Sequence, residues 1–174
     1  MSTKLVLATV LCAATAAAWA HGPTRQKVTE NVTVAASPDA VWERVQDFGT
    51  LHTWHPVVES SETTAGSQPG SIRTLHLKGG GTIVEELTKH SAAEHRFSYR
   101  MKDPGPLPVT NYSSTLSVTP GAGGGSVVEW RGAFYRGDPN GNPPPEKNDE
   151  AAIAAITGVY KTGLENLKKL MEGQ

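Results

Sequence analysis

The stretch NDEAAIAAITGVYKTGLENLKKLME, residues 148–172, decides the fold, because it predicts one long amphipathic helix. Asn148 can cap its N-terminus, and Asp149 and Glu150 then complement the positive end of the helix dipole. At ~1.5 Å per residue this helix is roughly 35 Å long, enough to cross a whole sheet. Its expected apolar face consists of Ile153, Ile156, Tyr160, Leu164, Leu167 and Met171.

Two glycines lie inside this helix, at positions 158 and 163. Each costs about 1 kcal/mol relative to alanine. Because glycine in a helix usually allows close approach, we expect a strand or a ligand to pack against Gly158 and Gly163.

The residues before the helix predict a sheet for it to cross. Six strand-like segments separated by turn-like residues are expected at 57–63, 71–77, 82–90, 95–101, 110–119 and 126–136. Their short separation favours antiparallel hairpins. A Pro-rich loop, 138–147, then separates the last strand from the helix.

The N-terminal part adds one strand and two short helices. Residues 27–35 alternate as a strand that buries Val28, Val32 and Val34. Ser37 is expected to cap a helix that follows it, and a helical turn is expected at 51–54. The element order predicts an α+β helix-grip fold, a curved antiparallel sheet wrapped around the C-terminal helix.

Residues 1–20 predict a cleavable secretory signal peptide. Lys4 precedes an apolar run at 5–18, and Ala18-Trp19-Ala20 is a small-x-small cleavage pattern. Cleavage there would leave a single domain, residues 21–174, in the periplasm. The alternative is an uncleaved anchor or a buried N-terminal helix, although the apolar run is shorter than the roughly 20 residues that span a membrane.

Composition excludes several functions for the exported domain. Sixteen basic and 17 acidic residues become 15 and 17 without Lys4, a formal charge of −2, and no basic block is present. Nucleic acid and membrane are therefore poor partners. Cys12 leaves with the signal peptide, so neither a disulfide nor a haem-attachment motif is expected, and no cofactor is expected.

The segments 37–56, 70–77, 82–90, 95–101, 110–118 and 158–170 resemble the SRPBCC superfamily of START-like and polyketide cyclase-like proteins. The resemblance covers the whole exported domain. A narrower resemblance, carried by HGPTRQKV at 21–28, DFGTLHTWHP at 47–56 and EWRGAFYRGD at 129–138, is to the MxaD family of periplasmic proteins. That narrower resemblance implies a role in methanol oxidation, aiding the interaction of methanol dehydrogenase with its cytochrome c acceptor.

The superfamily resemblance implies a ligand cavity between the sheet and the long helix. Strand alternation turns Glu85 inward with Ile83 and Leu87, and a carboxylate on an apolar face needs a partner. Arg73 is its candidate counter-ion, and the alternative is a purely structural ion pair. The candidate cavity residues are His55, Arg73, Glu85, Tyr99, Tyr112, Trp130, Phe134 and Tyr160. The alternative for Trp130, Phe134 and Tyr160 is plain core, which is the more common role of such aromatic residues.

Three functions follow as hypotheses. The first is a non-catalytic accessory protein of methanol oxidation that acts through protein contacts, with 103–108 and 138–147 as contact candidates. The second is a periplasmic carrier or sensor of a small hydrophobic ligand, which requires a cavity of at least a few hundred Å³. The third is a polyketide cyclase-like enzyme with His55 and Glu85 as acid and base. His52 with His55, or His21 at a new N-terminus, gives only a weak metal signal.

Overall fold

The computed structural model describes residues 22–173, so the signal peptide prediction and His21 lie outside the described residues. The described elements are β1 (Gln26–Val34), α1 (Pro38–Val45), η1 (Phe48–Thr53), β2 (Val58–Thr63), β3 (Ile72–Leu77), β4 (Thr82–Ser91), β5 (Arg96–Asp103), β6 (Val109–Pro120), η2 (Ala122–Gly124), β7 (Ser126–Arg136), η3 (Pro145–Lys147) and α2 (Asp149–Glu172). No helix among residues 22–173 is both long and apolar enough to cross a membrane.

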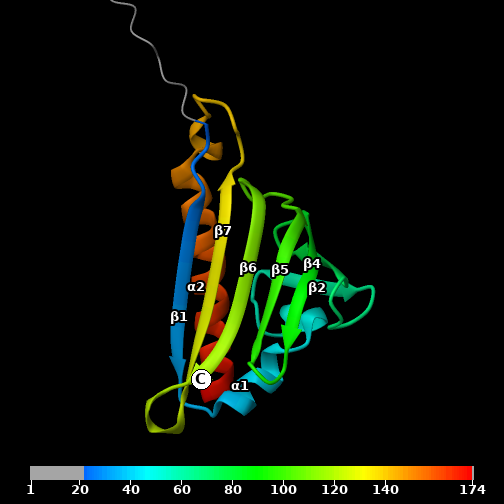
Figure 1. Cartoon of the computed structure of the whole chain (residues 1–174), viewed down its shortest axis with the longest axis vertical. Helices are drawn as coiled ribbons and strands as arrows, with labels where there is room; N and C mark the ends of the chain where they lie inside the picture. The colour runs from blue at the N-terminus through cyan, green and yellow to red at the C-terminus, as the bar shows by residue number, and fades with distance from the viewer. Residues whose placement is uncertain (1–21, 174) are drawn as a thin grey trace, which may run out of the picture.

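The strands form one antiparallel sheet in the order β1-β7-β6-β5-β4-β3-β2. The sheet curves, and α2 lies along its concave side, closest to β1 and β7 (Figure 1). The helix-grip prediction is confirmed. The first strand pairs with the last and not with its neighbour in sequence, so β1 and β2 form the two edges of the sheet.

The helix termini follow the sequence signals. The Ser37 side chain accepts from the backbone N–H of Ala40 at 3.3 Å, and Asn148 accepts from Ala151 at 2.8 Å. These caps satisfy N–H groups that the first turn leaves unpaired. At the other end of α2, Gly173 takes a left-handed conformation with φ of 69°, which ends the helix.

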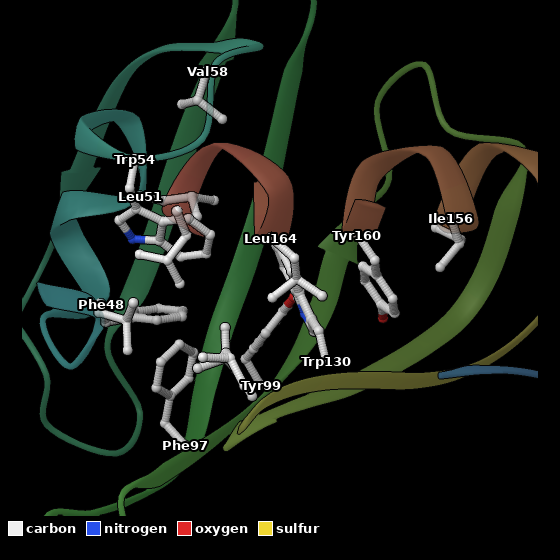
Figure 2. Close-up of a cluster of buried hydrophobic side chains, with 14 of the residues drawn as sticks. Phe48, Leu51, Trp54, Val58, Phe97, Tyr99, Trp130, Ile156, Tyr160 and Leu164 are labelled. Atoms are coloured by element: carbon white, nitrogen blue, oxygen red, sulfur yellow. The ribbon is translucent and has the colours of Figure 1, made fainter. Parts of the chain in front are cut away.

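The core lies between α2 and the concave face of the sheet. Ile156 and Tyr160 point from α2 toward the sheet, while Phe48 and Leu51 enter from η1 (Figure 2). The prediction for Ile153 is wrong, since its side chain is 37 % exposed. The buried stripe instead begins at Ala152 and continues at intervals of three or four residues through Ile156 and Tyr160 to Leu167, which leaves position 153 toward solvent.

The Pro-rich loop is held by one arginine. The buried Arg136 side chain donates to the carbonyl oxygens of Asp138 at 2.8 Å and Asn140 at 2.6 Å. It also bonds to Asp149 at 3.1 Å, at the start of α2. These hydrogen bonds fix the conformation of the loop that connects β7 to α2.

Candidate functional site

A cavity of about 170 Å³ lies between the inner face of the sheet and α2. Its apolar lining comes from Leu51, Val57, Val58, Leu75, Leu77, Ile83, Met101, Leu107, Ile156 and Val159. Val57 is 43 % exposed, and Leu77 and Leu107 are half-buried, so these side chains mark the mouth. The inner end is formed by buried side chains from η1, β4, β5, β6 and β7.

Five of the predicted site residues line this cavity: His55, Glu85, Tyr99, Tyr112 and Trp130. Arg73, Phe134 and Tyr160 are buried but stand behind that lining. At about 170 Å³, the cavity is smaller than the few hundred Å³ expected for a carrier of a small hydrophobic ligand, so that volume expectation is not met. The reason is that aromatic side chains fill the interior, with the rings of Trp130 and Tyr160 stacked at 4.6 Å between centroids. That any of these residues binds a ligand stays a prediction.

Glu85 meets the expected partner. Arg73 donates from Nε at 2.9 Å and from Nη2 at 2.5 Å, and both contacts end on Glu85 Oε2. The same guanidinium donates to the Phe48 carbonyl oxygen at 2.8 Å and lies 3.9 Å from the centre of the Phe48 ring. Both charged side chains are almost fully buried, so each needs the opposite charge of the other to offset the free-energy cost of its own burial.

His55 is fixed against α2. Its Nε2 lies 3.0 Å from the carbonyl oxygen of Val159, so Nε2 carries the hydrogen and donates it. The pKa of His55 is lowered to about 4, chiefly by burial; the hydrogen bond to Val159 opposes this shift, and the positive charge of Arg73 adds a smaller lowering. The ring is therefore neutral near pH 7, and its Nδ1 has no hydrogen-bond partner among residues 22–173.

Gly163 explains how the ring reaches this position. A Cβ at Gly163 would lie 2.6 Å from His55 Cδ2 and 2.9 Å from Trp130 Cζ3. The prediction of a close approach is confirmed here. It is wrong for Gly158, where a Cβ would meet nothing within 4 Å.

A buried cluster of hydrogen-bonded side chains forms the inner wall of the cavity. Tyr112 and Tyr160 hydroxyls are 2.5 Å apart, Tyr160 lies 2.9 Å from Ser114 Oγ, and Trp130 Nε1 lies 3.0 Å from the Tyr99 hydroxyl. Burial raises the pKa of Tyr99 to about 12, and it raises the pKa values of Tyr112 and Tyr160 well above their ordinary value. All three phenols are therefore neutral at physiological pH. Ser114 lies on the same face, and nothing in the sequence indicated its hydrogen-bonding role.

The metal hypotheses gain no support from the geometry. His52 is exposed, while His55 is buried and already bonded through Nε2. Within the described range 22–173, no group of three or more His, Cys, Asp or Glu side chains is placed to hold a metal ion.

A second hollow lies on the outer face of the sheet. It measures about 540 Å³ and is an open groove that includes Lys27, Thr88, Ser113 and Arg131 in its lining. Because it is open and polar, it does not enclose a ligand as the inner cavity does.

Comparison with known proteins agrees with this architecture. Protein XoxI from Bacillus cereus is 34 % identical, with a TM-score of 0.72 over 83 % of this chain and 94 % of that one. A putative uncharacterized protein from Bacillus thuringiensis is 32 % identical, with a TM-score of 0.73 over 84 % and 98 %. The Zhui aromatase/cyclase from Streptomyces sp. R1128 is 18 % identical, with a TM-score of 0.67 over 86 % and 94 %, and shares the fold.

A search among curated proteins finds no match. A family model matches residues 25–172, nearly all of the described chain, and its description is polyketide cyclase / dehydrase and lipid transport. The match also supports the SRPBCC superfamily that the sequence motifs resemble. The chain belongs to the polyketide cyclase / dehydrase and lipid transport family.

Proposed function

We propose that this protein binds one small, mostly apolar molecule in the inner cavity and holds it without transforming it. The observation that supports this is a cavity of about 170 Å³ with an apolar wall and two buried polar side chains, His55 and Glu85. Ligand sites usually combine such apolar walls with a few polar groups. An apolar protein cavity of about 150 Å³ is large enough to admit benzene, so a molecule of one ring fits this one.

The chemistry of the two polar groups favours binding over acid–base catalysis. A general base works best when its pKa lies near the working pH, whereas burial lowers the pKa of His55 to about 4. Glu85 is engaged by the guanidinium of Arg73. Both groups are thus poorly suited to move the protons of a ligand, and Glu85 is better suited to accept a hydrogen bond from it.

The proposal is tested by NMR titration of the purified protein with toluene and phenol, following the methyl signals of Ile83 and Ile156. We expect saturable shifts in these lining residues. Val159→Trp, in the part of the cavity lining that α2 provides, should abolish them by filling the cavity. Ala154→Trp, on the exposed side of the same helix, should leave them unchanged. Shifts that are absent, or equally large in Val159→Trp, would count against a binding cavity.

We also propose that the protein is exported and serves methanol oxidation as an accessory of methanol dehydrogenase and its cytochrome c acceptor. The support is the sequence resemblance at 21–28, 47–56 and 129–138, which is independent of the cavity. Mass spectrometry of the periplasmic protein should give an N-terminus at His21. Deletion of the gene should slow methanol-dependent cytochrome reduction, and an unchanged rate would contradict the accessory role.

A further inference from the structure

The free edge of His55 faces away from α2. The Cδ2–Nε2 edge of its ring lies against Gly163 and the Val159 carbonyl. Nδ1 is on the opposite side of the five-membered ring, and the ring is only 1 % exposed. Because Nε2 carries the hydrogen, Nδ1 presents a lone pair that is buried without a partner in the described chain. A buried acceptor without a donor is costly, and this nitrogen has almost no accessible surface of its own, so it is not the atom that a ligand in the cavity can reach.

Glu85 offers a second free acceptor. Both contacts from Arg73 end on Oε2, and Oε1 accepts no hydrogen bond from residues 22–173. The side chain is almost fully buried and lines the same cavity as His55. A carboxylate oxygen has room for two donors and forms hydrogen bonds about twice as strong as those of a neutral acceptor.

The hydroxyl hydrogens near the cavity are already used in hydrogen bonds within the protein. Their directions can be assigned one after another, beginning at a backbone carbonyl. Ser114 Oγ donates to the Arg131 carbonyl oxygen at 2.8 Å, since a carbonyl can only accept. With that hydrogen used, the contact between Ser114 and Tyr160 requires Tyr160 to donate. The hydrogen of Tyr160 is therefore not available to the cavity.

The same count continues through the remaining partners. Tyr112 must donate to Tyr160, and Tyr99 must then donate to Tyr112 across 3.3 Å. Trp130 Nε1 supplies the donor that Tyr99 accepts. Each hydroxyl group in this hydrogen-bonded series thus donates to the next one, and the last donates to the Arg131 carbonyl. The inner end of the cavity is therefore left with acceptors rather than donors.

We propose that the cavity selects a small, one-ring molecule carrying a hydroxyl or amino group, such as a phenol, whose hydrogen is accepted by Glu85 Oε1. This inference rests on the proposed binding function and adds the chemical class of the ligand. A carbonyl compound of the same size finds no free donor at the inner end of the cavity. A hydrocarbon of the same size leaves Glu85 Oε1 without a donor.

The test is an NMR titration of the purified protein at pH 7 with three molecules of nearly equal size. Phenol offers a donor, toluene offers neither donor nor acceptor, and benzaldehyde offers only an acceptor. Phenol is expected to bind at least about tenfold more tightly than the other two, the effect of one hydrogen bond to a charged acceptor. If toluene or benzaldehyde binds as tightly as phenol, the inference is overturned while the proposed binding function stands; if none binds, both fail.

Glu85→Gln sharpens the test because it exchanges the free acceptor for a donor. Its amide oxygen is expected to stay with Arg73, which places the amide N–H₂ where Oε1 was. Phenol should then lose about tenfold in affinity and benzaldehyde should gain, so that their order reverses. Glu86→Gln is the matched control, since Glu86 faces the other side of β4 and pairs with Arg100. An unchanged order in folded Glu85→Gln would overturn the inference, and if that variant does not fold, the wild-type series decides alone.

Discussion

The neutral, buried His55 makes a sharp prediction about the pH dependence of stability. Its pKa is lowered from 6.5 to about 4, chiefly by burial. Between these values the unfolded chain binds a proton that the folded protein does not. The contribution of the neutral His55 ring to the free energy of unfolding is therefore fully present above pH 6.5, and it is lost as the pH falls from about 6.5 toward about 4.

The magnitude follows from the two pKa values. Acidification from pH 7.5 to 5.0 should cost about 2 kcal/mol through His55, and the whole window should cost about 3 kcal/mol. His55→Gln cannot titrate, and its amide can still donate to the Val159 carbonyl. This variant should start less stable at pH 7.5, where the native ring packs well, and should lose about 2 kcal/mol less than wild type on acidification.

Urea denaturation at pH 7.5, 6.5, 5.5 and 5.0 measures these free energies of unfolding. His52→Gln is the matched control and should keep the wild-type pH dependence, since His52 is exposed in the folded protein as in the unfolded chain. Parallel curves for wild type and His55→Gln would refute the reasoning. They would mean that His55 is protonated, or exposed, in the folded protein.

Three further perturbations test the packing around the site. Gly158→Ala should stabilise the protein by up to about 1 kcal/mol, because a Cβ there meets nothing within 4 Å. Gly163→Ala should destabilise the protein by about 1–2 kcal/mol, because the new methyl group meets two buried rings. Equal denaturation midpoints for the two variants would contradict this. Arg73→Met should cost about 3–5 kcal/mol by leaving Glu85 unpaired, and a second change, Glu85→Leu, should restore part of that loss in a double-mutant cycle. Tyr160→Phe should cost about 1–3 kcal/mol in thermal unfolding, because the Tyr112 hydroxyl loses its acceptor.

Local sequence signals predicted the fold well. Period-two alternation turned Glu85 inward, as the structure has it, and the candidate cavity residues Tyr112 and Trp130 are buried as well. The caps at Ser37 and Asn148 form as expected, because capping depends on a few neighbouring atoms. Such features need no knowledge of distant contacts.

The details of the site depend on contacts that sequence spacing does not encode. The small volume of the cavity results from how Trp130 and Tyr160 stack. The free Nδ1 of His55 results from a bond to a carbonyl 104 residues away. The direction of the hydroxyl chain is set by one backbone oxygen, that of Arg131, and could be deduced only from distances.

A crystal structure of the protein soaked with phenol tests the central claim most directly. We predict one ring in the inner cavity, with its hydroxyl about 2.5–3.0 Å from Glu85 Oε1. Density for ordered water alone in that cavity, at a phenol concentration that saturates the NMR shifts, would contradict the account.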